Sequence, residues 1–325
     1  MKIAGIDVGG TKCAVILGEA DKGGKPSVID KTVIATKDYP DPYQMIERMQ
    51  QDLAGLLKKH GLEAKELASI GISCGGPLDS VQGVVLSPPN LPGWDEVHIV
   101  KLFQDKFGVP AAIQNDANAC ALVEWIMGAG RGTRNMVFLT FGTGMGSGLI
   151  LNGQLYAGTN DLGGEVGHIR LAPDGPIGFG KAGSFEGFCS GGGIAQLAKT
   201  VVSEKLNDNQ PVSFCPTLEK AEELDAKTVF LAAQTGDPVA NEIVGISAYY
   251  LGQGLSILID ILNPECIVIG SIYSRNEDLF KPLIERILEQ EAIPSAYQVC
   301  KIKPAETGDS IGDYAALCVA VYNNQ

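Results

Sequence analysis

Two segments of the chain share one local design: an apolar strand, a turn rich in glycine and threonine, and a second apolar strand. The first runs from Ile3 to Leu17 and has Asp-Val-Gly-Gly-Thr-Lys at its turn. The second runs from Met136 to Leu151 and contains Gly-Thr-Gly-Met-Gly-Ser-Gly. A plain hairpin needs one or two glycines, so the extra glycines indicate close approach of the backbone to a ligand. The repetition predicts an internally duplicated fold.

Strands and helices alternate through the rest of the chain. Apolar residues at helical spacing predict a helix over 43–59, and Asn263-Pro264 ends a long helix predicted over 238–262. A later strand is expected near 297–303. Because hairpins and strand–helix units occur in both halves, the sequence predicts two α/β domains that face each other across a cleft.

Charge and composition restrict the partners of the protein. The 38 acidic and 25 basic residues give a net charge of −13, which argues against non-specific binding to nucleic acid or to an anionic membrane. The N-terminus lacks the apolar stretch of a signal peptide, and no uninterrupted apolar run approaches the roughly 20 residues of a membrane span. Eight cysteines without CxxC spacing lie mostly in apolar runs, which is typical of a reducing compartment. We therefore expect a cytoplasmic protein that binds small molecules.

The first turn combines groups suited to the phosphates of a nucleotide. An apolar strand brings the carboxylate of Asp7 to its end, and Gly9-Gly10 leave backbone N–H groups available to an anion. Thr11 and Lys12 add a hydroxyl and a positive charge. The turn is not a P-loop, because its spacing differs and a strand follows it. Taken alone, it also fits a hairpin turn that happens to use glycines; the two turns together favour ATP phosphates, with Mg²⁺ at Asp7.

The pair Asn115-Asp116 follows a short apolar strand and precedes a predicted helix. Enzymes of the α/β class place active groups at this position. An aspartate there can take the proton from a sugar hydroxyl as the hydroxyl attacks the γ-phosphate of ATP. Asn and Asp are also the preferred N-caps of helices, and for the pair in isolation capping is the favoured interpretation.

The segment 164–168 reads Gly-Glu-Val-Gly-His, so that Glu165 and His168 lie three residues apart. These two side chains can hydrogen-bond the neighbouring hydroxyls of a sugar. They can equally hold a metal or belong to an ordinary surface turn, and the residues alone leave these alternatives open.

Taken together, these stretches resemble the ROK family of sugar kinases and sugar-responsive repressors, in the actin/hexokinase superfamily. Further matches lie at 87–94 (Ser-Pro-Pro-Asn-Leu-Pro-Gly-Trp) and at 263–270, and the matches keep their order over nearly the whole chain. The resemblance implies two ribonuclease H-like α/β domains flanking an active-site cleft. The smaller would comprise 1–116 and the C-terminal helix 308–325, and the larger 117–307.

The resemblance also implies an activity, ATP-dependent phosphorylation of a hexose hydroxyl, most closely that of a glucokinase. An N-acetylhexosamine kinase, a fructokinase and a non-catalytic sugar-binding protein are alternatives within the family. Repressors of the family carry a DNA-binding winged helix before the first strand. Here that strand starts at Ile3, so a repressor is not expected. Family members commonly form dimers or tetramers, and we expect a homodimer or homotetramer.

Roles of single residues follow from the resemblance as well. Asp116 is the expected general base. The expected sugar contacts are Asn90, Asn115, Asp116, Glu165, His168 and Glu186. The expected ATP contacts are Asp7, Gly9, Gly10, Thr11, Lys12, Gly142, Thr143 and Gly144 at the phosphates and Gly270 beside the adenosine, with Asp7 holding Mg²⁺.

The sequence departs from the family in the stretch that follows His168. Many members have Cys-x-Cys-Gly-x-x-Gly-Cys there, and these thiolates bind a structural zinc together with the histidine. The aligned positions here are Ile177, Phe179 and Ser184, which supply no thiolate. We expect no structural zinc, and we expect Ile177 and Phe179 to be buried so that apolar contacts replace the metal bonds. Beside the adenosine, Gly270-Ser271-Ile272 replaces the usual glycine run.

Overall fold

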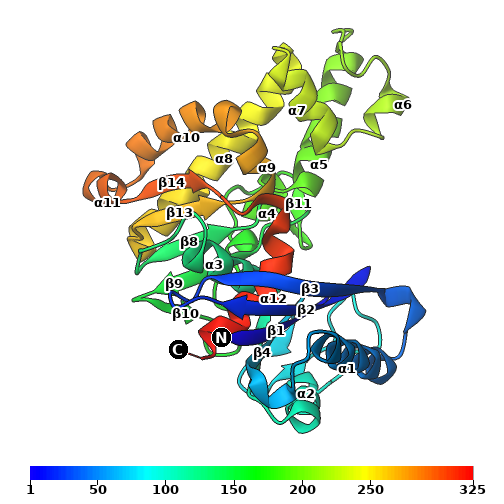
Figure 1. Ribbon diagram of the computed structural model, residues 1–325. Helices are drawn as coiled ribbons and strands as arrows, with labels where there is room; N and C mark the ends of the chain where they lie inside the picture. Colours follow the sequence, from blue (N-terminus) through cyan, green and yellow to red (C-terminus); the bar gives the residue numbers. More distant parts are fainter. Residues whose placement is uncertain (325) are drawn as a thin grey trace. The chain divides into compact units, whose positions relative to one another are not determined.

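The computed structural model describes residues 1–324, apart from the side chain of residue 309. The chain forms two compact units (Figure 1), the first from 1–132, 148–163 and 306–325, and the second from 133–147 and 164–305. The chain therefore passes between the units four times. This division does not test the predicted domain boundary at residue 116, which stays a prediction.

The first unit is built on a five-stranded sheet of order β3–β2–β1–β4–β7. The first three strands form an antiparallel meander, and β4 and β7 run parallel to β1. The register pairs Asp7 with Ser73 and Ser73 with Gln114, so the carboxyl ends of β1, β4 and β7 meet at one edge. The strands are β1 (Lys2–Val8), β2 (Lys12–Ala20), β3 (Pro26–Ala35), β4 (Leu67–Cys74) and β7 (Ala111–Asn115).

One face of this sheet is covered by α1 (Pro42–Lys59) and α2 (Ile99–Phe107), which bury an apolar cluster against the strands (Figure 1). Met45, Met49 and Phe103 are fully buried in this cluster. The predicted helix over 43–59 is thus confirmed within one residue, and Asp41 caps its first turn by accepting a hydrogen bond from the backbone N–H of residue 44 at 3.0 Å.

The other face is covered by α12 (Ile311–Tyr322), with α3 (Asp116–Ile126) packed beside it. Gly71 in β4 makes this packing possible. A Cβ atom at Gly71 would lie 2.0 Å from the carbonyl oxygen of Ala316, so only glycine allows the helix backbone to approach the strand this closely.

Smaller elements complete the first unit. In the hairpin β9–β10, Asn152 and Gly153 have φ of 56° and 78°, as a two-residue Asn-Gly turn requires. The elements are β5 (Leu78–Asp79), β6 (Val84–Val85), β9 (Ser147–Leu151), β10 (Gln154–Tyr156) and the short 3-10 helices η1 (Thr36–Asp38), η2 (Ala64–Glu66) and η4 (Gly308–Ser310).

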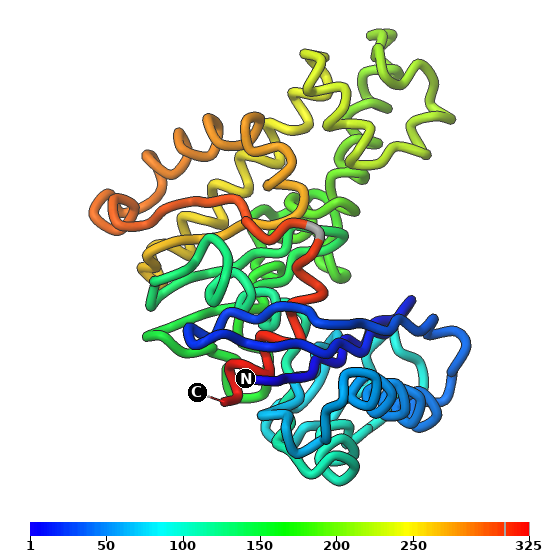
Figure 2. Tube along the Cα trace, viewed as in Figure 1, coloured from blue at the N-terminus to red at the C-terminus, as the bar shows by residue number. Residues whose placement is uncertain are grey.

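The second unit contains three parallel strands in the order β8–β13–β14: β8 (Met136–Leu139), β13 (Cys266–Ile269) and β14 (Lys301–Pro304). Two helices, α8 (Pro238–Leu262) and α10 (Glu277–Glu291), run side by side (Figure 2). The strand predicted near 297–303 is wrong in its first half, where α11 (Pro294–Val299) stands. Pro294 is the first residue of that helix, a position at which proline's fixed φ and missing N–H are tolerated.

Five helices of this unit, α4 through α8, begin at capping side chains. The side chains of Ser184, Ser190, Thr217, Asp225 and Asp237 accept hydrogen bonds from the first turns of α4 through α8. The elements not yet given are η3 (Val166–His168), β11 (Ile177–Gly178), β12 (Lys181–Ala182), α4 (Phe185–Phe188), α5 (Gly191–Asn207), α6 (Leu218–Ala221), α7 (Ala226–Gln234) and α9 (Ser271–Arg275).

One helix of the described chain, α8, is long and apolar enough to span a membrane by length and composition, with a mean hydropathy of 1.3 in its most apolar stretch. Of that stretch, 61% is buried, and the core helix of a globular unit passes the same test. All eight cysteines are free and seven are buried, in agreement with their expected place among small core side chains.

Candidate active site

Asp7 and Asp116 lie at the same edge of the first sheet. Asp7 stands near the end of β1, Asp116 directly follows β7, and β4 lies between the two strands. Burial raises the pKa of the Asp7 carboxyl to about 6; Lys12 and Lys31 oppose this shift, and the negative charge of Asp116 adds to it. The two carboxyl groups are therefore close enough to influence each other's ionisation.

The sequence left helix capping and catalysis open for the pair Asn115-Asp116, and the structure gives the capping role to Asn115 alone. The N-cap of α3 is Asn115, whose Oδ1 accepts a hydrogen bond from the N–H of Asn118 at 2.7 Å. Asp116 is the first residue of the helix, and its Oδ1 accepts from the N–H of Ala117 at 2.8 Å. Asp116 is exposed to solvent. The protein atoms around its carboxyl nevertheless desolvate it and raise its pKa. Asp116 is therefore a carboxylate that a substrate can reach and that does not cap the helix.

Asn90 lies against the turns that follow β1 and β4. A Cβ at Gly10 would stand 2.5 Å from the carbonyl oxygen of Asn90, and a Cβ at Gly75 would stand 3.3 Å from its Oδ1. The carbonyl of Gly9 accepts a hydrogen bond from the hydroxyl of Thr36 at 2.6 Å, which fixes the first turn. Thr11 and Lys12 are exposed. The first unit thus gathers the predicted residues Asp7, Gly9, Gly10, Thr11, Lys12, Asn90, Asn115 and Asp116 around one sheet edge.

The second unit brings its own predicted residues together around the turn 142–146. The Oε2 of Glu186 accepts a hydrogen bond from the N–H of Met145 at 2.9 Å, and a Cβ at Gly144 would lie 2.8 Å from the same oxygen. A Cβ at Gly167 would lie 2.3 Å from the carbonyl oxygen of Met145. The segment 165–168, the turn and Glu186 are therefore in direct contact, and the side chains of Glu165 and His168 are exposed.

A cavity of about 640 Å³ opens beside this turn, within the roughly 300–1,000 Å³ usual for ligand pockets. Phe230, Leu231 and Ile272 give it an apolar wall, and Lys227 and Arg275 give it positive charge. The amides of Gly191 and Gly192 donate to the carbonyls of Gly142 and Thr143 at 2.8 and 3.4 Å, so the start of α5 is joined to the turn. The other lining residues are Gly142, Thr143, Gly191, Gly192, Asp225, Ala226, Gln234, Ser271 and Asn276.

Among these lining residues, sequence reasoning found Gly142 and Thr143 as ATP contacts and placed Ser271 and Ile272 in the turn beside the adenosine. The run Gly191-Gly192-Gly193 after a serine cap is a signal that could have identified the start of α5. Lys227, Phe230 and Gln234 lie on one face of α7 at helical spacing, a pattern that does not distinguish a cavity wall from any other helix face.

Gly270 is placed beside the cavity by the end of β13. Its N–H donates to the carbonyl of Leu139 at 2.9 Å, and the N–H of Ile272 donates to that of Phe141 at 3.0 Å. Ser271, at the cavity wall, has φ of 50°. This left-handed conformation suits glycine, and it explains physically why a glycine run is the common choice at this turn.

The expectation that Ile177 and Phe179 are buried is wrong. Their side chains are 54% and 83% exposed. The loop is held by hydrogen bonds instead of apolar contacts. The side-chain amide of Gln196 donates to the carbonyl of Ile177 and accepts from its N–H, each at 2.9 Å, and the hydroxyl of Ser184 accepts from the N–H of Gly187 at 3.0 Å.

The residues present differ in their fit to the two metals, zinc in the loop after His168 and Mg²⁺ at Asp7. No group of three or more His, Cys, Asp or Glu side chains among the described residues is arranged to hold a metal. The residues at Ile177, Phe179 and Ser184 do not fit zinc, and the expected lack of structural zinc stays a prediction. Mg²⁺ usually takes one or two carboxylates together with substrate phosphates. Asp7 fits that requirement because it is a carboxylate near the end of β1, at the sheet edge that it shares with Asp116.

The sequence model of the ROK family matches residues 3–321. The chain belongs to the ROK family. A glucokinase of Halalkalibacterium halodurans is 32% identical over 310 residues, which cover 95% of this chain and 91% of the relative. The crystal structure of a ROK family glucokinase from Streptomyces griseus in complex with glucose and AMPPNP has a TM-score of 0.71 at 26% identity and covers 98% of this chain and 99% of that one.

ROK proteins differ in what they do. The DNA-binding transcriptional repressor Mlc of Escherichia coli is 27% identical over 313 residues, 95% of this chain and 74% of the repressor. The likenesses confirm the predicted family and the predicted α/β fold of actin/hexokinase type. Membership alone does not choose between kinase and repressor.

Proposed function

We propose that this protein is an ATP-dependent hexose kinase, glucokinase-like, in which Asp116 is the general base. The observation that carries the proposal is the placement of Asp116. Its carboxylate is reachable from solvent, shares a sheet edge with Asp7, and is relieved of helix capping by Asn115.

Asp116 takes the proton of the attacking sugar hydroxyl. Desolvation raises its pKa, and a base whose pKa is nearer the working pH accepts a proton more readily. Asn90 and Asn115 of the first unit and Glu165, His168 and Glu186 of the second are the proposed contacts to sugar hydroxyls. Glu186 already has one oxygen bound to the N–H of Met145, which orients its carboxylate.

The nucleotide is proposed to lie with its adenosine in the cavity of the second unit, where Phe230 and Ile272 offer an apolar wall to the base. The phosphates are assigned to the two glycine turns. Close packing leaves room only for glycine at Gly10, and a Cβ at Gly144 would displace the carboxylate of Glu186. Asp7 would hold the Mg²⁺ that accompanies ATP, and this ion would supply positive charge to offset the charge of the phosphates.

The substrate within the hexoses is not decided by these residues, because specificity rests on a few hydroxyl contacts. The relatives named glucokinase favour glucose; an N-acetylhexosamine and fructose are the alternatives. A cytoplasmic location and a homodimeric or homotetrameric state remain predictions from the sequence.

The test is an assay of ADP release, coupled to a dehydrogenase, with Mg-ATP and a panel of glucose, mannose, fructose, N-acetylglucosamine and N-acetylmannosamine. We expect at least one sugar to stimulate ADP release strongly above the sugar-free rate. If none does while the protein still binds sugars by calorimetry, the chain is a sugar-binding family member and the proposal is wrong.

A further inference from the structure

Phe179 is a large aromatic side chain held in solvent at an unfavourable backbone position. It is 83% exposed, and its φ of 44° lies in the left-handed region. Gly180, with φ of 73°, completes a two-residue turn between β11 and β12. Such turns favour Asn-Gly or Asp-Gly, since a side chain with a bulky Cβ substituent is strained there. Neither the turn nor a packed core accounts for phenylalanine at this position.

The hairpin that carries Phe179 is fixed at its base. Besides the two hydrogen bonds between Gln196 and the backbone of Ile177, the guanidinium of Arg170 donates to the carbonyl of Ala182 at 2.7 Å. The ammonium of Lys181 donates to the carbonyl of His168 at 2.7 Å. Phe179 is thus displayed by a rigid hairpin, so that little conformational freedom of its backbone remains to be lost when a ligand binds.

His168 is the neighbour of this ring. The two ring centroids are 6.1 Å apart with an interplanar angle of 78°, an edge-to-face arrangement, and both side chains are exposed. A sugar that hydrogen-bonds to the imidazole of His168 therefore lies within reach of the Phe179 ring. Polar side chains such as His168 bind the hydroxyl groups of a sugar. An aromatic ring offers an apolar surface to the C–H groups of the same sugar.

We propose that Phe179 is a specificity-determining residue that contacts the C–H face of a pyranose held by His168. This rests on the proposed function, in which His168 binds the sugar. The contact favours sugars in the pyranose form with several ring C–H groups on one face, and it gains affinity from burying the ring rather than from a further hydrogen bond.

The decisive variant is Phe179→Asn, because Asn-Gly is the preferred sequence for this turn. We expect the melting temperature to be unchanged or raised, while the dissociation constant for the best sugar, measured by calorimetry without ATP, rises roughly tenfold, equivalent to about 1.4 kcal/mol. Phe179→Trp keeps an aromatic surface and should restore most of the affinity. Val81→Ala, which shortens a 94% exposed side chain of the first unit, is the control and should leave sugar affinity unchanged.

A raised stability together with weakened sugar binding separates contact with the ligand from a structural role, which would move both in the same direction. If Phe179→Asn binds the sugar within twofold of the wild type, the inference is overturned while the kinase proposal stands. If the wild-type protein neither binds nor phosphorylates any sugar of the panel, the proposed function is wrong, and the inference about Phe179 is wrong with it. An unchanged KM for ATP in Phe179→Asn supports a contact confined to the sugar, and a tenfold rise in that KM contradicts it.

Discussion

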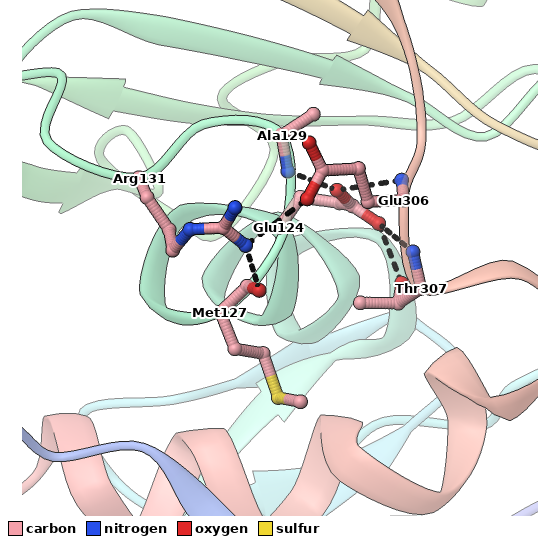
Figure 3. A network of polar contacts seen from close by, with 6 residues as sticks. All are labelled: Glu124, Met127, Ala129, Arg131, Glu306 and Thr307. Atoms are coloured by element: carbon pink, nitrogen blue, oxygen red, sulfur yellow. Dashed lines mark hydrogen bonds and ion pairs between the residues drawn. The ribbon is translucent and has the colours of Figure 1, made fainter.

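Glu124 offers a quantitative test of how the chain is anchored where it re-enters the first unit at residue 306. Its side chain is fully buried, and its carboxylate accepts four hydrogen bonds (Figure 3). Oε2 accepts from the N–H groups of Ala129 at 2.8 Å and Glu306 at 3.2 Å, and Oε1 accepts from the N–H of Thr307 at 3.0 Å and its hydroxyl at 2.5 Å. One carboxylate on α3 thus ties the loop after that helix to the segment that leads into α12.

Replacing Glu124 by alanine leaves these donors without their acceptor and opens a void on α3. An unsatisfied buried polar group costs about 1–3 kcal/mol. Water can reach part of the opened space, so the costs of the separate donors do not add in full. We expect the first unit to lose about 3–5 kcal/mol of unfolding free energy, because four neutral donors lose their acceptor at about 1–3 kcal/mol each, less the part that water recovers. Glu124→Gln keeps an acceptor but turns an NH₂ group toward donors, and it should lose about 2–3 kcal/mol.

Both tryptophans, Trp94 and Trp125, lie in the first unit, so tryptophan fluorescence during urea unfolding reports on that unit. The matched control is Arg131→Ala. Arg131 pairs with the side chain of Glu306 at 3.0 Å in the same network, but both side chains are about half exposed, at 55% and 52%, and such surface pairs contribute roughly 0–1 kcal/mol. A loss below about 1 kcal/mol for Glu124→Ala, or an equal loss for Arg131→Ala, would refute the reasoning.

Three further predictions use the same structure. The rate at limiting Mg-ATP and saturating sugar should be highest above pH 6 and fall as pH drops through about 6, because the metal-free Asp7 has its pKa raised to about 6 and must lose its proton to bind Mg²⁺; a profile flat down to pH 4.5 contradicts this. Gly144→Ala should raise KM for ATP at least tenfold, since its Cβ would lie 2.8 Å from Glu186 Oε2, whereas Gly245→Ala, with no atom within 4 Å of its Cβ, should not. Ser271→Gly should stabilise the second unit by about 1 kcal/mol by removing a left-handed serine, and a lower melting temperature in calorimetry would count against it.

Much of the first unit could be predicted from sequence because its signals are local. The strand–turn–strand pattern places Asp7 at a strand end, and the apolar strand before Asn115 places Asp116 in the same way. That both carboxylates share an edge depends on the parallel pairing of β4 with β1 and β7, a contact between distant segments that no local pattern specifies. Which of Asn115 and Asp116 caps the helix could not be predicted, since both residue types cap well and helix starts are uncertain by a residue or two.

The second unit shows where sequence reasoning fails. Because thiolates are missing at Ile177, Phe179 and Ser184, the sequence predicts no structural zinc, but it does not indicate what holds the loop instead. The answer lies in Gln196, on another element, and a glutamine in a helix carries no pattern that marks such a role. The cavity wall on α7 was missed for the same reason, because contacts between distant segments leave no periodic trace.

The most direct test of the account is the turnover of Asp116→Asn with Mg-ATP and the best sugar of the panel. Asn115 remains to cap α3, so the melting temperature and the dissociation constant for the sugar should stay close to those of the wild type. The turnover number should fall by about 10²–10⁴, the usual contribution of a general base. Turnover within threefold of the wild type, with the fold and sugar binding intact, would contradict the assignment of Asp116 as the base.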